Sequence, residues 1–217
     1  MARKQLLSFL LIFSLLFSCA SALAETDDDD DWDDNVDDAW EMEHPLHSGD
    51  YAYALLDDGT VEITSYGGAD TEIVIPDTLD GKPATAIGER AFYYSLSLTS
   101  VTIPDSVTCI SKRAFSCCYN LMSIALPSGL TAIEPGTFEL CNSLTSIAIP
   151  DSITTIAEDA FVSCKALQSF TLSPNHPYFF LADGALCRTV DNTLLFYPNA
   201  RENRTYRIPD GIAAISA

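Results

Sequence analysis

The sequence predicts a solenoid, a stack of short coils of equal length, and three observations predict it. A 23-residue unit recurs along the chain, marked by Pro104, Pro127 and Pro150. Within each unit the apolar residues alternate as they do in a short strand. The composition, 47% hydrophobic in 217 residues, supplies enough apolar material for a packed core. Because one such coil cannot bury its inner side chains alone, neighbouring coils must stack to cover one another.

The repeat includes the apolar positions between these prolines. Four further series keep the 23-residue step: Ile110, Ile133 and Ile156; Phe115, Phe138 and Phe161; Cys118, Cys141 and Cys164; and Leu121, Leu144 and Leu167. An earlier copy begins at Ile75 and carries five extra residues before Ile87. Stacking superimposes each series into a continuous ladder of inward side chains.

Each unit predicts two short extended segments and one turn. Val101 and Ile103 alternate with polar residues, which is typical of a strand with every second side chain inward. The proline that follows cannot donate a hydrogen bond, so the strand ends there. Val107 and Ile110 fit a second extended segment, and residues 112–115 fit one helical turn. We therefore expect a β-rich α/β solenoid with short parallel strands plus one helical turn per coil.

The repeated unit, LxxIxIPxxVTxIxxxAFxxCxxL, resembles the BspA-type bacterial leucine-rich repeat. The resemblance covers residues 71–217 and implies a leucine-rich repeat solenoid in an exported surface protein with a role in adhesion or host contact. Residues 49–70 resemble the β-hairpin that commonly precedes such arrays, because two alternating segments flank a turn at residues 57–60. We expect this N-terminal hairpin to cap the open end of the first coil.

The repeat departs from its pattern after Leu172. The next Ile-Pro pair, Ile208-Pro209, comes 35 residues after Pro174. The residues between, about 176–204, predict an inserted hairpin, and the last repeat is incomplete at Ala217. Either the chain is a truncated product, or the inserted hairpin and the final strand serve as a carboxy-terminal cap.

The first 24 residues predict a secretory signal peptide. Arg3 and Lys4 precede the apolar run Leu6–Phe17, and small residues precede a cleavage point after Ala24. Lipidation of Cys19 and a retained membrane anchor are the two alternatives. All three place the remainder of the chain outside the cytoplasm, secreted or at the cell surface.

Residues 25–48 predict an acidic, disordered linker. Residues 25–43 hold twelve of the 31 acidic residues and no base. Repulsion within such a run opposes any compact fold. The whole chain has 11 Lys and Arg and a formal net charge of −20, which argues against nucleic acid as a partner.

Cysteine and histidine are few, and their positions favour packing over chemistry. Cys118, Cys141 and Cys164 share one inward position and are expected to form a reduced, buried ladder. Secretion also permits disulfides, and Cys109 and Cys117, which lie off this ladder, are expected to be more reactive.

Metal binding and catalysis are not expected. His44 and His47 have the spacing of a zinc-binding pair, but they lie in the acid-rich linker, where we expect no metal. No nucleophile is placed beside a base, so the sequence suggests no catalytic residue and no cofactor.

Two surfaces are the candidate binding sites. The outward strand positions form a flat ribbon of small side chains, and the inserted hairpin adds aromatic and basic residues. The candidate residues are Ser100, Thr102, Met122, Ser123, Ser146, Ser169 and Thr171 on the ribbon, and Tyr178, Phe179, Arg201 and Arg204 in the hairpin.

The sequence thus predicts a non-enzymatic extracellular module that binds a protein or a glycan. We expect a monomer that has no membrane span after signal cleavage and binds no nucleic acid. The alternative is a structural stalk or accessory module of a larger surface assembly without its own ligand. An enzyme is a third and weaker hypothesis, because the sequence lacks a site for one.

Overall fold

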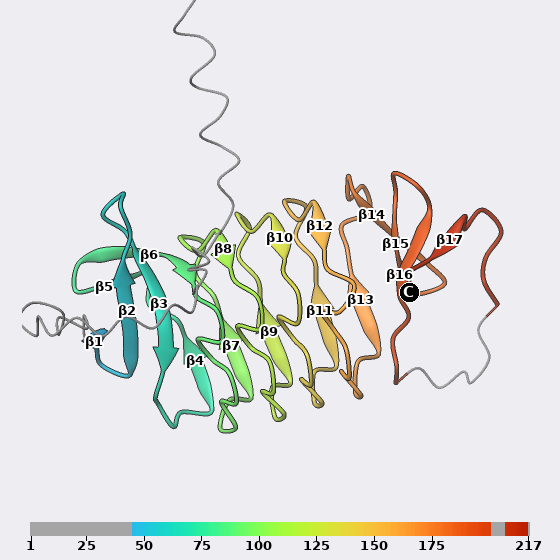
Figure 1. Ribbon diagram of the computed structural model, residues 1–217. Helices are drawn as coiled ribbons and strands as arrows, with labels where there is room; N and C mark the ends of the chain where they lie inside the picture. The colour runs from blue at the N-terminus through green and yellow to red at the C-terminus, as the bar shows by residue number, and fades with distance from the viewer. Residues whose placement is uncertain (1–44, 201–206, 217) are drawn as a thin grey trace, which may run out of the picture. The chain divides into compact units, whose positions relative to one another are not determined.

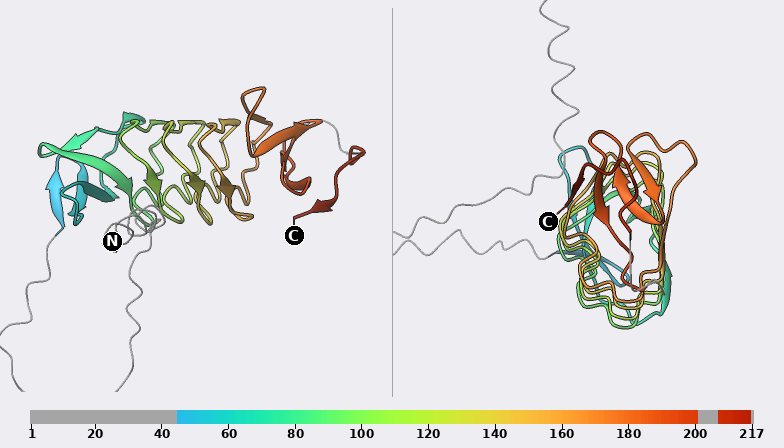
Figure 2. Two further views of the ribbon diagram at one scale, coloured as in Figure 1. Left: turned by 90° about the horizontal axis from the view of Figure 1, so that it is seen from above. Right: turned by 90° about the vertical axis from the view of Figure 1, so that its right-hand side faces the viewer.

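The computed structural model describes residues 45–200 and 207–216 as a series of coils stacked along one axis (Figure 1). The signal peptide, most of the acidic linker, and Arg201 and Arg204 lie outside these residues. Seen along the axis, successive coils superimpose on one outline (Figure 2). The predicted leucine-rich repeat solenoid is confirmed.

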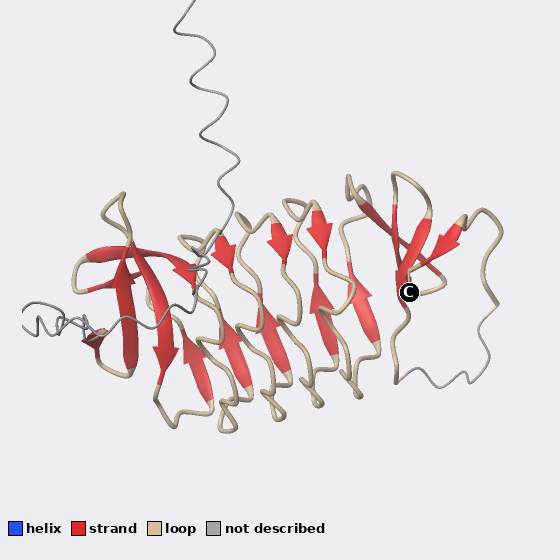
Figure 3. Ribbon diagram, in the orientation of Figure 1, coloured by secondary structure: helices blue, strands red, loops and turns tan. Residues whose placement is uncertain are grey.

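Two strips of short parallel strands run along the stack (Figure 3). The first strip contains β4 (Glu72–Val74), β7 (Ser100–Thr102), β9 (Ser123–Ala125), β11 (Ser146–Ala148) and β13 (Ser169–Thr171). The second contains β6 (Lys82–Ile87), β8 (Cys109–Ile110), β10 (Ala132–Ile133) and β12 (Thr155–Ile156). Ser100 pairs with Ser123 and Ser146 pairs with Ser169, so equivalent residues of successive repeats lie side by side.

A stack of phenylalanine rings forms one corner of the core. Phe92, Phe115, Phe138 and Phe161 lie one above another, with consecutive ring centroids 4.8, 5.9 and 5.6 Å apart and ring planes within 14° of parallel. All four side chains are buried. Each ring therefore covers the ring of the preceding coil, which is how the recurrent phenylalanine produces a continuous core.

The cysteine ladder lies next to this stack. The thiols of Cys118, Cys141 and Cys164 each lie within hydrogen-bond reach of a phenylalanine carbonyl oxygen of the preceding coil, at 3.0, 3.3 and 3.0 Å. All three are free and fully buried, and burial raises the pKa of Cys118 and of Cys164 to about 12. They act as small apolar side chains with one weak donor each.

The expectation of one helical turn per coil is wrong: the described residues contain no helix. Each coil turns a corner instead, at residues 113–117 and their equivalents, which we call the corner turn. Its backbone N–H groups alternate, one donating within its own coil and the next donating to the following coil. Ser116 N–H donates to the Arg113 carbonyl oxygen, whereas Phe115 N–H donates to Thr137 and Cys117 N–H to Glu139. Arg113 and Cys117 adopt φ angles of 57° and 62°, in the left-handed region. Such residues interrupt a right-handed helix, and the hydrogen bonds between coils offset their cost of about 1–2 kcal/mol each.

The N-terminal strands lie at the first end of the array. They are β1 (Leu46–Ser48), β2 (Tyr51–Leu55) and β3 (Val61–Tyr66), which pair antiparallel in order, and β3 then pairs in parallel with β6. The Tyr66 ring lies 5.4 Å from that of Phe92 and extends the aromatic stack by one ring. The sequence assigned residues 25–48 to the linker, but β1 occupies the last three of them, because Leu46 to Ser48 complete an edge beside β2.

An aspartate fastens this end of the molecule. Asp80 lies between β5 (Thr78–Leu79) and β6, and its carboxylate accepts hydrogen bonds from Tyr53 Oη at 2.7 Å and from Ser48 Oγ at 2.9 Å. Both bonds lower the pKa of Asp80, and the bond between Tyr53 and Asp80 raises the pKa of Tyr53. One carboxylate thus joins β1, β2 and the β5–β6 turn.

The inserted segment at the other end is larger than the predicted hairpin. It forms a three-stranded antiparallel meander of β14 (Phe179–Ala182), β15 (Ala185–Arg188) and β16 (Thr193–Phe196), and β17 (Ala214–Ile215) pairs in parallel with β16. The Phe196 ring meets Phe161 edge-on at 5.2 Å. The aromatic stack therefore ends against the meander.

Replacing one phenylalanine tests the contribution of the stacked rings to stability. Phe138 is fully buried between two rings, so Phe138→Ala is expected to lower the free energy of unfolding by about 3–5 kcal/mol, as large cavities do. Urea unfolding followed by circular dichroism measures this loss. Ala148→Ser, on the exposed strand face, is the control and should change stability by less than about 0.5 kcal/mol. Equal stability of the two variants would show that Phe138 is not buried between two rings.

The Asp80 contacts predict a pH-dependent stability. A carboxylate with a lowered pKa in the folded protein stabilises it above the unfolded pKa and loses that effect as the pH falls through the folded value. Asp80→Asn should therefore be less stable than the parent at neutral pH, and the difference should vanish in strong acid. Thermal unfolding between pH 2 and pH 7 measures it, about the span over which an aspartate titrates. Asp57→Asn, in the exposed β2–β3 turn, is the control, and a difference for Asp80→Asn that persists unchanged in acid would contradict this assignment.

Candidate binding surfaces

The strand face is flat and carries small side chains. Thr102, Ser123, Ser146, Ser169 and Thr171 are exposed as predicted, Ser100 is half-buried, and Met122 is exposed at the edge of this face. Ser123 donates a hydrogen bond to Ser100 across the ladder at 3.1 Å. A partner backbone can approach such a face closely, but the face has no aromatic or arginine anchor of the kind that dominates binding energies.

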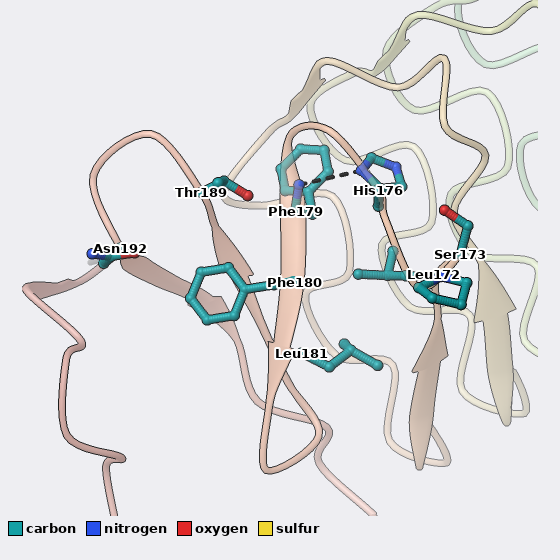
Figure 4. Close-up of a pocket in the computed structure, with 9 residues that line it drawn as sticks. Leu172, Ser173, His176, Phe179, Phe180, Leu181, Thr189 and Asn192 are labelled. Carbon is teal, nitrogen blue, oxygen red and sulfur yellow. Dashed lines mark hydrogen bonds between the residues drawn. The ribbon is translucent and has the colours of Figure 1, made fainter.

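A cleft lies where the regular array meets the meander (Figure 4). Its volume is about 590 Å³, within the range of small-ligand pockets. It is lined by Leu172, Ser173, Pro174, His176, Phe179, Phe180, Leu181, Thr189 and Asn192. The cleft arises because the chain leaves the repeat after β13, so the wall that a further coil would supply is replaced by β14.

His176 fixes the position of β14. Its Nε2 lies 2.9 Å from the Pro150 carbonyl oxygen of the preceding coil. Its Nδ1 accepts hydrogen bonds from the backbone N–H groups of Tyr178 and Phe179, each at 3.2 Å. Two N–H donors to Nδ1 require the proton on Nε2, which then donates to Pro150. The imidazole is largely buried, so it joins the meander to the array as a structural side chain.

The cleft combines apolar and neutral polar groups. Phe180 and Leu181 present apolar surface on either side of β14, with Leu181 pointing toward Leu172 and Phe180 toward Asn192, and Thr189 and Asn192 add polar groups. The nearby carboxylate is already paired, since Asp191 accepts a hydrogen bond from Arg188 at 2.7 Å, which is the main reason that its pKa falls to about 2. Such a site suits a ligand with an apolar face and neutral hydrogen-bonding groups.

The hairpin candidates from the sequence divide into three groups. Tyr178 is 44% exposed beside the cleft and remains a candidate. Phe179 is 2% exposed and packs against His176, so it lines the cleft as a buried side chain and not as an exposed anchor. It is the first residue of β14 and points into the core because the His176 contacts orient the strand. Arg201 and Arg204 lie outside the described residues.

Phe180 is one of the aromatic residues that the sequence places in the inserted segment, but the candidate binding residues include neither it nor Leu181 nor His176. The signal was present, because the repeat breaks after Leu172 and an apolar pair follows the break. Sequence reasoning also missed a cluster of tyrosines, with the exposed Tyr93 and Tyr94 in one corner turn and the half-buried Tyr119 in the next. These tyrosines occupy positions at which the other repeats share no residue type.

Among residues 45–200 and 207–216, no group of three or more His, Cys, Asp or Glu is placed to hold a metal ion. Across the same residues there is no helix with the length and apolar character needed to cross a membrane.

Comparison with protein families identifies the class of protein. The model of the BspA-type leucine-rich repeat region matches residues 71–180 in six copies. The chain belongs to this family, whose repeats form a bacterial surface-type module. Leucine-rich repeat proteins are generally non-enzymatic binding modules, and no enzyme family is indicated. A search of curated proteins finds no match.

Solved structures of bacterial leucine-rich repeat proteins are similar to this chain. A protein from Bacteroides capillosus is 30% identical with a TM-score of 0.52, covering 59% of this chain and 98% of its own. One from T. pallidum is 29% identical with a TM-score of 0.51, covering 58% and 71%. The pneumococcal vaccine antigen PcpA, 17% identical with a TM-score of 0.50 and coverage of 80% and 61%, shares the fold.

Removing the imidazole tests the junction. His176→Ala leaves the N–H groups of Tyr178 and Phe179 without their acceptor, which costs about 1–3 kcal/mol. We expect faster hydrogen exchange at those two amides and a lower urea midpoint. His176→Asn keeps an acceptor oxygen near Nδ1 and should restore part of the protection, whereas His47→Ala, an exposed histidine in β1, should have no effect. Unchanged exchange in His176→Ala would show that β14 is held by other contacts.

Proposed function

We propose that the chain is a non-enzymatic extracellular binding module that recognises a protein or a glycan at a bacterial cell surface. The cleft between β13 and β14 is the observation that carries this proposal. It lies where the repeat is interrupted, it is concave, and apolar side chains from β14 line it beside neutral polar groups. The ligand contacts this cleft and extends along the adjoining strand face through Ser169 and Thr171.

The remaining features of the chain agree with an exported module. Residues 1–24 have the charge and apolar pattern of a signal peptide cleaved after Ala24, with lipidation of Cys19 as the alternative. Residues 25–43 carry twelve acidic residues and no base, a composition typical of a solvated tether. The name of PcpA describes that protein as a vaccine antigen, and the shared fold makes a surface location reasonable for this chain too.

Capture from a panel of candidate ligands tests the proposal. The full chain is immobilised and exposed to matrix proteins, mucins and bacterial wall glycans. Saturable binding is expected, and Phe180→Ala and Leu181→Ala should each weaken it at least tenfold, about 1.4 kcal/mol or more, as truncation of an interface anchor does. Leu55→Ala is the matched control, because Leu55 is similarly exposed at the opposite end of the array.

Two results would contradict this function. A folded chain that captures none of the panel would favour a structural stalk or accessory module without its own ligand. Binding that survives both cleft substitutions would place the ligand elsewhere on the surface.

A further inference from the structure

A corner of the first two coils carries an exposed group of tyrosines. The ring centroids of Tyr93 and Tyr94 are 6.1 Å apart, and Tyr94 meets Tyr119 of the next coil edge-on at 5.8 Å. Tyr93 is 49% exposed and Tyr94 54%. Arg90 completes the group, with its Cζ 6.0 Å from the centroid of the Tyr93 ring. We call these four residues the tyrosine corner.

The stacking of the coils does not require these side chains. The positions equivalent to Tyr93 hold Ser116, Glu139 and Val162, and the position equivalent to Tyr119 in the following coil holds Asn142. The core positions on either side of them repeat faithfully. Aromatic side chains exposed where the fold tolerates serine and glutamate need another explanation, and tyrosine and arginine are the residue types most enriched at binding hot spots.

The rings of the tyrosine corner support one another. Tyr94 contacts both Tyr93 and Tyr119, and interaction with the Cys117 thiol is the largest cause of the raised pKa of Tyr93 and of Tyr119. These ring contacts limit the conformations that the exposed rings can adopt. A fixed aromatic face loses little conformational entropy when a ligand packs on it.

The charges at the tyrosine corner favour an anion. Glu89 is paired with Lys112 at 3.3 Å, and Glu139 with Arg113 at 3.8 Å. Among residues 45–200 and 207–216, Arg90 makes no ion pair, and its guanidinium lies over the Tyr93 ring. In a chain of net charge −20 this is a local site where an exposed guanidinium can receive a carboxylate with two hydrogen bonds.

The tyrosine corner is too small for a stable protein interface. Four residues are far fewer than the roughly 20–30 residues that each partner contributes to such an interface. They match one or two sugar rings, whose C–H faces pack on aromatic rings while their hydroxyl groups stay in water.

We propose that the tyrosine corner binds a saccharide that carries a carboxylate, with a sugar ring on Tyr94 and the carboxylate on Arg90. This site lies on a different part of the array from the cleft, so it can stand or fail independently of the function proposed for the cleft. It adds a second contact for a glycan-bearing surface, and two weak contacts on one array strengthen attachment by raising the effective concentration.

Titration of the full chain with small saccharides tests the site. The probes are 3′-sialyllactose and trigalacturonic acid, with lactose as the uncharged comparison, followed by saturation-transfer NMR. We expect saturable binding of at least one acidic probe and at least tenfold weaker binding of lactose. Tyr94→Ala and Arg90→Gln should each weaken the acidic probe at least tenfold.

Matched controls separate the site from a general effect. Ser163→Ala replaces the residue equivalent to Tyr94 three repeats later, and Lys165→Gln removes an exposed positive charge away from the corner. Both should leave binding unchanged. The proposal is overturned if neither acidic probe binds, if lactose binds equally well, or if Phe180→Ala abolishes binding while Tyr94→Ala does not. A dimer that Tyr94→Ala dissociates would also overturn it, because the corner would then be an interface between two copies.

Discussion

Hydrogen bonds between consecutive coils are the constraint on which the rest of this structure depends. At each corner turn, every second N–H donates to the next coil, as Phe115 and Cys117 do to Thr137 and Glu139. These bonds require residues in the left-handed region within the turn, so the turn cannot become a helix. They also fix the spacing at which the phenylalanine rings stack. The backbone pattern and the aromatic core therefore impose the same 23-residue period.

The first and last coils of the described stack make different contacts with the segments that adjoin them. At the first end β3 joins the second strip through β6, Tyr66 adds a ring to the stack, and Asp80 fastens β1 and β2. At the other end Phe196 meets the last phenylalanine edge-on, and His176 ties β14 to the preceding coil. At both ends a polar side chain outside the repeated positions makes the connection, Asp80 at the first end and His176 at the other.

The period allowed the array to be predicted, because a repeated position has the same environment in every copy. The strand positions, the inward isoleucines and the cysteine ladder all lie where the 23-residue step placed them. The helical turn was predicted wrongly, since local sequence does not reveal that alternate N–H groups donate to a neighbouring coil. The sequence did not show that Phe179 would be buried, for a related reason. Its burial depends on His176, a contact that exists only in the folded chain.

A binding surface is expected where the sequence departs from the repeat. An inward side chain of the repeat packs against its equivalents in the two neighbouring coils, so it cannot be replaced without loss of stability. From β7 to β13 the outward strand positions hold small side chains, each beside its equivalents at the spacing of strands, as Ser100 and Ser123 are. The first strand of the strip, β4, carries the larger Glu72 and Val74 instead. Large exposed side chains also gather where the geometry gives them room. These places are the meander, which leaves the stack altogether, and the corner turns, where Tyr93 and Tyr94 point away from it. Specificity in such an array can thus change at its corners and ends without altering the core that supports them.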